Sequence, residues 1–341
     1  MKGMTTVERI EDFSCLGEWL RNPEVQSELS EKAFYSNAWF TPENVKRAIN
    51  GVAGWLNPDV LTDWLNSYEL LNNKPISTGV VMAGNIPLAG FHDFLSVLTS
   101  GNILNAKLSA QDSVLMPLIA EELKKINPAW EARIHFCDRI GETDAVIATG
   151  SNNTARYFEY YFKDRPLLLR KNRNSAAVLT GSETESELSG LAEDVMSYFG
   201  LGCRNVSLIF MPEDYPLEKI TRALFPMNQI LEHHKYANSY TYQRTLLLMD
   251  LQPFTDTGFC ILRESDLAGS PVSVIHYCRY KTHEEVIRWA EANKDQLQCI
   301  TGKILPGTIP HGMAQYPTVK DYADHIDTIS FLINVAANQF R

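Results

Sequence analysis

The sequence predicts an α/β fold built from a parallel-sheet domain and a second α/β domain that carries a reactive cysteine. From residue 76 onward, short apolar segments alternate with segments of helical periodicity. Strands that alternate with helices imply crossover connections, and therefore a parallel sheet. Loops rich in glycine and hydroxyl side chains follow several of the apolar segments. Ligands of such sheets bind beyond the carboxyl ends of the strands, so these loops are the expected site.

Composition limits the classes of protein that the chain can belong to. A chain of 341 residues suggests about two domains, and a hydrophobic content of 45% is enough for a sizeable core. The formal net charge of −10 argues against a nucleic-acid-binding protein, which needs a basic surface. No apolar run reaches the roughly 18 residues of a membrane span, and the polar N-terminus does not resemble a signal peptide.

The six cysteines are scattered and form no CxxC pair, so we expect no metal site. Reduced thiols in a cytoplasmic protein are the simplest interpretation.

We expect four segments along the chain. Residues 1–75 have helical periodicity, and Thr41 with Pro42 marks a helix start in this N-terminal segment. The other three are a parallel-sheet domain over 76–180, a second α/β domain over 181–315 and a C-terminal tail over 316–341.

The spacing of apolar residues predicts whether each segment is a strand or a helix. Expected strands are 78–83, 102–108, 132–136, 145–148, 166–169, 176–179, 206–211, 245–251, 272–277 and 297–300, with a further strand-like piece over 326–335. Expected helices are 88–98, 113–126, 153–162, 188–199, 217–231 and 284–293.

Cys203 follows a Gly-Leu-Gly turn between an expected helix and an expected strand. Glycine adopts the strained backbone of such a turn at little cost, and reactive side chains are often presented at such bends. A thiolate there could act as a covalent nucleophile. The alternative is that Cys203 is a small hydrophobic residue that fills a gap.

The loop from Gly84 to Gly90 follows the first expected strand but lacks the GxGxxG spacing of the ordinary dinucleotide fingerprint. Gly84 leaves room for a ligand near the N-terminus of the next helix. The amide of Asn85 could donate to a developing oxyanion, or it could instead satisfy the backbone of its own turn.

Two further loops carry polar residues at strand ends. Lys107 and Ser109 suit a ribose or phosphate contact, although Lys107 could equally be a solvent-exposed edge lysine. Gly150 and Ser151 could contact a phosphate, or they could simply cap the following helix.

The order of these motifs resembles the aldehyde dehydrogenase superfamily, and more closely its acyl-CoA reductase branch, the LuxC-type fatty-acid reductases of luminous bacteria. The segments that carry the resemblance are GNIPLAGFHDFLSVLTSGNILNAKLSAQDS, FGLGCRNVSLIF and KDYADHIDTISFL, and it covers roughly residues 75–335. The resemblance implies an aldehyde-dehydrogenase-like fold with one dinucleotide-binding domain and one thiol-bearing domain. The chain is shorter than typical members.

The resemblance also implies a role for each candidate residue. Cys203 becomes the acyl-accepting nucleophile, and Asn85 becomes the side-chain half of the oxyanion hole, with the backbone N–H of Cys203 as the other half. The cofactor's ribose would lie at Lys107 and Ser109. Its phosphates would lie at Gly150 and Ser151.

Three positions depart from the family pattern. Arg170 stands where hydrolytic aldehyde dehydrogenases carry the glutamate that activates water, which favours CoA-linked reduction over oxidation to a free acid. Leu267 replaces a glutamate that touches the nicotinamide ribose in the family. Ala110 replaces the glutamate of NAD-preferring relatives, so we expect NADPH as the cofactor, with NADH as the alternative.

The expected activity is therefore NAD(P)H-dependent reduction of an acyl-CoA, or of another acyl thioester, to an aldehyde. Two alternatives remain: an aldehyde or semialdehyde dehydrogenase, and a non-catalytic scaffold for an acyl-transferring protein partner. A homo-oligomer is expected. His92, His233, His234 and His311 are weaker candidates for a catalytic base.

Overall fold

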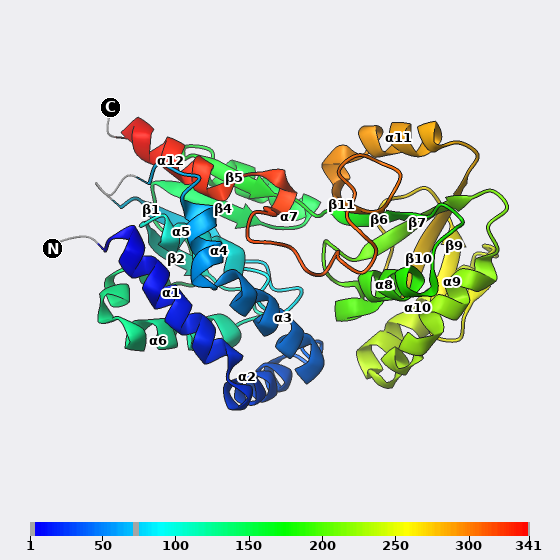
Figure 1. The fold of residues 1–341 in the computed structure, drawn as a ribbon, viewed down its shortest axis with the longest axis horizontal. Helices are drawn as coiled ribbons and strands as arrows, with labels where there is room; N and C mark the ends of the chain where they lie inside the picture. The colour runs from blue at the N-terminus through cyan, green and yellow to red at the C-terminus, as the bar shows by residue number, and fades with distance from the viewer. Residues whose placement is uncertain (1–3, 71–74, 340–341) are drawn as a thin grey trace. The chain divides into compact units, whose positions relative to one another are not determined.

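The computed structural model describes residues 4–70 and 75–339, and the chain divides into two compact units (Figure 1). The first unit comprises Met1–Lys171 and Thr318–Arg341, and the second comprises Asn172–Pro317. The N-terminal helices and the C-terminal segment lie in the unit of the first sheet. The division into four segments stays a prediction. The boundary expected at residue 75 borders residues 71–74, which lie outside the described residues.

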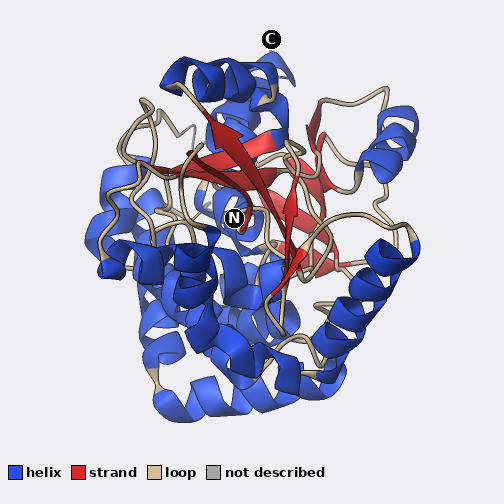
Figure 2. Ribbon diagram, turned by 90° about the vertical axis from the view of Figure 1, so that its right-hand side faces the viewer, coloured by secondary structure: helices blue, strands red, loops and turns tan. Residues whose placement is uncertain are grey.

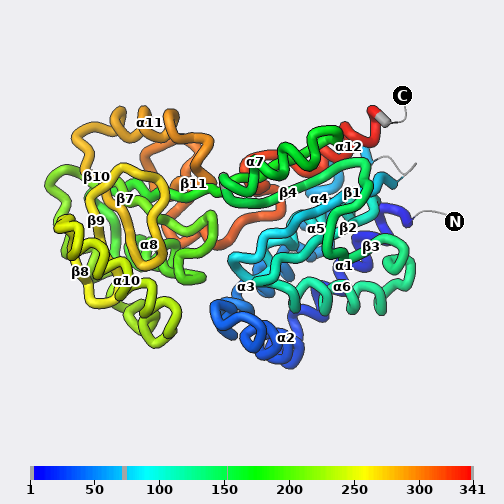
Figure 3. The backbone as a smooth tube through the Cα atoms, turned by 180° about the vertical axis from the view of Figure 1, so that it is seen from behind, coloured from blue at the N-terminus to red at the C-terminus, as the bar shows by residue number. Residues whose placement is uncertain are grey.

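The first unit is built on a five-stranded parallel sheet with the order β3-β2-β1-β4-β5 (Figure 1, with β3 labelled in Figure 3). Each strand lies at or near a segment that its apolar run predicts. The strands are β1 (Ser77–Val81), β2 (Ile103–Lys107), β3 (Ile134–Phe136), β4 (Ala145–Thr149) and β5 (Leu167–Arg170).

The helices of the first unit come before, between and after the strands of this sheet in the chain. The N-terminal helices are α1 (Thr6–Arg21), α2 (Pro23–Ser36), α3 (Pro42–Trp55) and α4 (Pro58–Leu65). The others are α5 (Phe91–Thr99), α6 (Leu115–Ile126), η1 (Pro128–Ala132), α7 (Asn152–Tyr161), η5 (Ala323–His325) and α12 (Thr328–Gln339). Thr41 caps α3 and Pro42 is its first residue, as the sequence predicts. Helices α2 and α3 lie side by side (Figures 1 and 3).

One hydrophobic core joins the N-terminal helices, the sheet and the C-terminal segment of the first unit. Trp64 in α4 is fully buried, and its indole N–H donates to the hydroxyl of Tyr322 at 2.8 Å. The hydroxyl of Tyr68 donates to Asp327 at 2.8 Å, just before α12. These contacts explain why the C-terminal segment is part of this unit.

The second unit contains a six-stranded sheet with the order β11-β6-β7-β10-β9-β8, in which only the β8–β9 pair is antiparallel (strands red in Figure 2). Its strands are β6 (Asn174–Val178), β7 (Val206–Pro212), β8 (Thr255–Asp256), β9 (Ile261–Glu264), β10 (Val274–Tyr280) and β11 (Leu297–Gly302). Its helices are α8 (Glu185–Met196), η2 (Ser197–Gly200), α9 (Leu217–Leu224), η3 (Phe225–Glu232), α10 (His234–Met249), α11 (His283–Ala292) and η4 (Lys294–Gln296).

Two expected strands are wrong. Residues 245–251 belong to the end of α10 and the turn after it, and most of 326–335 belongs to α12. A short apolar run has the same composition in a buried strand and in a buried helix, and these two runs gave no other signal. The strand expected over 176–179 exists as β6, but it pairs in the second sheet, beside β7 and β11.

No helix within residues 4–70 and 75–339 combines the length and the apolar character that crossing a membrane requires.

Candidate functional site

The first unit gathers three candidate loops at one edge of its sheet. The loops follow β1, β2 and β4, and the carboxyl ends of parallel strands share one edge. Strand β1 lies between β2 and β4. The chain therefore places β2 and β3 on one side of β1 and then β4 and β5 on the other side, so the direction of strand addition reverses at β1. Such a reversal of strand order is where doubly wound sheets bind nucleotides.

Gly84 packs so closely against the loop after β2 that no side chain fits. A Cβ at this position would lie 2.5 Å from Cβ of Ser109 and 2.6 Å from its Oγ. The glycine therefore allows the loop after β1 to touch the loop after β2, which is a packing role. The cofactor role expected for Gly84 stays a prediction.

Asp112 ties the same two loops together. Its Oδ2 accepts the backbone N–H of Leu88 at 2.9 Å, and Leu88 has a φ of 59°. The carboxyl group is buried, and burial raises the pKa of Asp112 to about 6. Within the described residues, its Oδ1 is buried without a hydrogen-bond partner.

The polar side chains at this edge differ in exposure. Asn85 and Lys107 are exposed, and Lys107 is the last residue of β2. Ser109 is half-buried, and its Oγ accepts the backbone N–H of Gln111 at 3.2 Å. An exposed cation at the end of β2 is available for an anionic ligand.

Gly150 and Ser151 connect β4 to α7. The hydroxyl of Ser151 accepts the backbone N–H of Thr154 at 3.2 Å, so this serine caps the helix. Gly150 donates its N–H to the carbonyl of Arg170 at 3.1 Å. Helix capping, which the sequence left as an alternative for Ser151, is therefore present, and the phosphate role stays a prediction.

Arg170 lies buried at the end of β5. Its Nη2 is 2.9 Å from Oδ1 of Asp93 and donates to the hydroxyl of Thr328 at 2.6 Å. Both charged side chains are 5% exposed. This arginine holds α5 and α12 to the sheet, so it serves the packing of the first unit rather than presenting a group to solvent.

In the second unit, Cys203 is an exposed residue of a tight turn before β7. The hydroxyl of Ser175 in β6 donates to the carbonyl of Cys203 at 3.0 Å. Nε of the next residue, Arg204, donates to the carbonyl of Ala314 at 2.5 Å. The turn thus presents the thiol while neighbouring segments hold its backbone.

Asp194, in the last turn of α8, holds a second loop beside this turn. It is fully buried, and its carboxylate accepts the backbone N–H groups of Gly312 at 2.7 Å and Ala314 at 2.9 Å. Burial raises the pKa of Asp194 to about 6, although the two N–H groups favour the charged form. The carbonyl that holds Arg204 therefore lies on a loop that Asp194 fixes.

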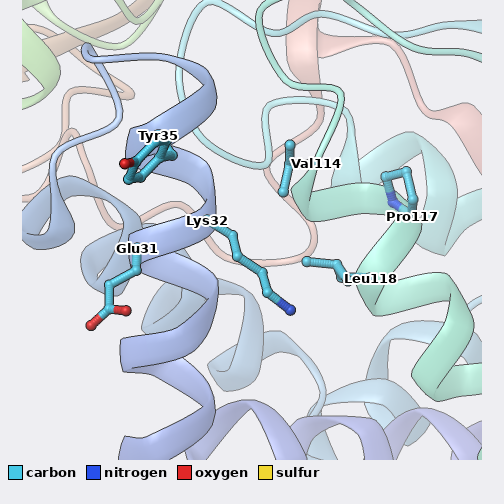
Figure 4. A pocket seen from close by; sticks show the side chains of 6 residues that line it. All are labelled: Glu31, Lys32, Tyr35, Val114, Pro117 and Leu118. Atoms are coloured by element: carbon cyan, nitrogen blue, oxygen red, sulfur yellow. The ribbon is translucent and has the colours of Figure 1, made fainter.

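A cavity of about 30 Å³ lies next to the segment before the turn, and Phe199, Gly200 and Tyr236 are among its lining residues. That volume is enough for one water molecule and far too small for an acyl chain. A much larger surface groove of about 650 Å³ lies in the first unit, between α2 and the start of α6 (Figure 4). Its lining residues are Glu31, Lys32, Tyr35, Val114, Pro117 and Leu118, none of which is a predicted site residue.

Two of the candidate histidines have structural surroundings. His92 is packed against the rings of Trp55 and Tyr322, its Nε2 is 2.8 Å from the carbonyl of Val319, and burial lowers its pKa. His233 caps α10 through its ring nitrogen.

The sequence pattern did not indicate the buried polar residues that hold the candidate loops or Arg170, namely Asp93, Asp112, Ser175, Asp194 and Asn205. The partners of the first four lie far away in the chain, and no local pattern marks these residues. For Asn205 a weak signal was present, because an asparagine two residues after Cys203 is typical of a turn.

The predicted residues fall into two sets. Gly84, Asn85, Lys107, Ser109, Gly150 and Ser151 all lie in the first unit at the same sheet edge. Cys203 belongs to the second unit, so the joint action of Asn85 and Cys203 stays a prediction.

Comparison with solved structures identifies the fold. Scans against family models and against curated protein sequences found no match. An aldehyde dehydrogenase of Bacillus cereus in complex with NAD+ is similar over 87% of this chain and 72% of its own, with a TM-score of 0.63 and 14% identity. A 1-pyrroline-5-carboxylate dehydrogenase of Thermus thermophilus is similar over 97% and 81%, with a TM-score of 0.64 and 12% identity.

The aldehyde dehydrogenase KauB of Pseudomonas aeruginosa is also similar, over 89% of this chain and 73% of its own, with a TM-score of 0.64 and 12% identity. The chain therefore has the aldehyde-dehydrogenase-like α/β fold that the sequence predicts. Identities this low establish the fold alone.

Proposed function

We propose that the protein is a nicotinamide-dependent oxidoreductase that carries an acyl group as a thioester on Cys203. The observation that carries the proposal is the exposed thiol on a turn that two hydrogen bonds hold: Ser175 donates to the carbonyl of Cys203, and the side chain of Arg204 donates to the carbonyl of Ala314. A nucleophile on a fixed backbone needs little reorganisation when its substrate arrives. The fold of the chain, shared with NAD-binding and aldehyde-oxidising enzymes, supports this class of chemistry.

The sheet edge of the first unit fits a dinucleotide. It combines the strand-order reversal, the exposed cation of Lys107 and the N-terminus of α7 after Ser151. These groups suit ribose and phosphate. A reduced nicotinamide bound there would supply hydride to the acyl carbon. Because Ala110 offers no carboxylate against a 2′-phosphate, NADPH is the preferred form in this proposal, and NADH is the alternative.

In the finer proposal, the substrate is an acyl-CoA or another acyl thioester, and the product is an aldehyde. The thiolate of Cys203 attacks the carbonyl carbon, and the amide of Asn85 with the Cys203 N–H stabilises the oxyanion. The C–S bond to CoA breaks, and the CoA thiolate leaves and takes a proton. After hydride arrives, the carbon–sulfur bond to Cys203 breaks and the aldehyde departs. One acyl-CoA, one reduced nicotinamide and one proton give aldehyde, CoA and oxidised nicotinamide.

Aldehyde or semialdehyde oxidation is the second candidate, and the names of the similar structures favour it at least as strongly. Its last step is hydrolysis of the thioester, which needs a base to activate water. The segment where relatives carry that base reads Leu168 to Asn172 and contains no carboxylate. Arg170 in that segment forms a buried ion pair with Asp93. If a thiol such as CoA accepted the acyl group in place of water, no base would be needed to activate water.

Intact-protein mass spectrometry after mixing the protein with a set of acyl-CoAs, without cofactor, tests the proposal. Wild type should gain one acyl group, NADPH should discharge it, and Cys203→Ala should gain none. Cys15→Ala is the matched control, since Cys15 is also an exposed cysteine, and it should behave as wild type. A thioester formed only from aldehyde and oxidised cofactor would select the second candidate. No adduct on Cys203 under any of these conditions would contradict both and favour a scaffold.

A further inference from the structure

The turn that carries Cys203 is closed from both ends by a single residue, Asn205. The backbone N–H of Asn205 donates to the carbonyl of Gly202 at 3.1 Å, which is the ordinary closure of a β-turn. In the opposite direction, the N–H of Gly202 donates to Oδ1 of Asn205 at 2.8 Å. Cys203 and Arg204 are therefore the two central residues of a turn that is held at its first and last residues.

The other end of the Asn205 side chain binds the end of α8. Its Nδ2 donates to the carbonyls of Asp194 at 3.1 Å, Val195 at 3.3 Å and Ser197 at 2.8 Å. The last carbonyls of a helix have no partner within the helix, so an outside donor is needed. An amide has two protons for these three carbonyls, which means that one proton is shared. The side chain is 3% exposed, so no solvent can replace it.

The segment between α8 and the turn has an unusual backbone. Tyr198, Phe199 and Gly200 are consecutive residues with φ values of 51°, 60° and 74°. Residues other than glycine adopt such values only with backbone strain, and they persist where the surroundings enforce them. The Asn205 amide binds on both sides of this segment, to α8 and to Gly202. It is therefore placed to enforce that conformation.

We infer that Asn205 is a positioning residue, which sets the orientation of Cys203 for attack on its acyl substrate. The inference rests on the proposed function and adds a residue to it. The role requires a side chain that accepts from Gly202 and donates to α8 at once. An amide can do both, whereas an ionised carboxylate can only accept and a methyl group can do neither. Displacement of a reacting atom by about 1 Å can cost roughly 100-fold in rate.

The test compares Asn205→Ala and Asn205→Asp with matched changes at Asn102. Asn102 is also a buried amide, 6% exposed, and it accepts the N–H of Ile76 and donates to Ser100 in the first unit. Both Asn205 variants should acylate Cys203 at least tenfold more slowly, with a lower kcat and little change in KM. Both should also change the pH profile of Cys203 alkylation by iodoacetamide, read by peptide mass spectrometry. The Asn102 variants should lose stability but keep both rates.

A folded Asn205→Ala whose acylation and alkylation rates equal those of wild type would overturn the inference. If neither Asn205 variant folds, amide hydrogen exchange of the wild-type protein tests the inference. The N–H of Gly202 should be protected from exchange, because it donates to Oδ1 of Asn205. Full exchange of that amide within seconds would also overturn it. Alkylation of Cys203 by iodoacetamide does not depend on the acyl substrate. A wild-type protein whose Cys203 is alkylated by iodoacetamide but is never acylated would therefore contradict the proposed function rather than this inference.

Discussion

The guanidinium of Arg170 and the carboxylate of Asp93 form a buried ion pair, with Nη2 and Oδ1 2.9 Å apart and both side chains 5% exposed. The hydroxyl of Thr328 in α12 accepts a hydrogen bond from the same guanidinium nitrogen. The pair thus joins the end of β5 to α5, and it brings the C-terminal helix to the same point. Removal of one partner leaves the other charge buried and uncompensated.

Arg170→Met should therefore lower the free energy of unfolding by about 3–5 kcal/mol. Urea denaturation followed by circular dichroism measures this change. The double variant Arg170→Met/Asp93→Leu should recover much of the loss, because it removes both charges. A single variant as stable as wild type would mean that water reaches the pair.

Asn85→Ala should lower turnover by about 100- to 1000-fold, the usual cost of one oxyanion donor. Because Asn85 is exposed, its thermal unfolding should stay close to that of wild type. Steady-state kinetics with acyl-CoA and NADPH give the rate. Near-wild-type turnover would remove Asn85 from the oxyanion hole.

Gly84→Ala should weaken nicotinamide binding or destabilise the first unit, since the new Cβ would lie 2.5 Å from Cβ of Ser109. Fluorescence titration with NADPH and thermal unfolding measure the two effects. Gly51→Ala is the control: a Cβ at Gly51 in α3 meets no atom within 4 Å. It should stabilise the protein by roughly 0.5–1 kcal/mol. Equal effects of both changes would contradict a packing role for Gly84.

Asp112 should make stability depend on pH. Burial raises its pKa from 3.8 to about 6, so the folded protein keeps a proton that the unfolded chain has already released. Its contribution to stability is complete below the unfolded pKa and is lost as the pH rises through about 6. The stability difference between wild type and Asp112→Asn should change by about 2 kcal/mol between pH 4 and 7.

Denaturant unfolding at a series of pH values measures that difference. Asp59→Asn, a change at an exposed aspartate of α4, should show no such trend. A flat difference for Asp112→Asn as well would place its carboxylate in contact with solvent.

Ala110→Glu should shift cofactor preference from NADPH toward NADH. The new carboxylate would lie three residues after Lys107 and repel a 2′-phosphate, at a cost of roughly tenfold in KM, or about 1.4 kcal/mol. The ratio of kcat/KM for the two cofactors is the readout. An unchanged ratio would place the 2′ position away from this loop.

The sequence predicts best those elements that have both a periodic run of apolar residues and turn residues, such as glycine or proline, beside that run. Strand β1 has an apolar run, a loop with glycine and proline, and a helix after it, and its position follows from these. The runs over 245–251 and 326–335 lack such boundaries, and both were expected as strands although they lie largely in helices.

Contacts between distant residues could not be predicted at all. The sequence marked Arg170 as a departure from a family pattern, but its partners Asp93 and Thr328 are 77 and 158 residues away. The thiol at Cys203 was found because glycines precede it. The side chain of Asn205 was missed because its role depends on the end of a helix that the turn alone does not reveal.

The connectivity of the two units has a consequence for synthesis. Residues 172–317 form the second unit as one continuous piece, whereas the first unit needs residues 318 onward as well. Domains generally fold in the order in which the ribosome releases them. Here the unit that is begun first is finished last. Until Tyr322 and Thr328 emerge, Trp64 and Arg170 lack their partners, so nascent chains that stop short should expose the core of the N-terminal helices to chaperones.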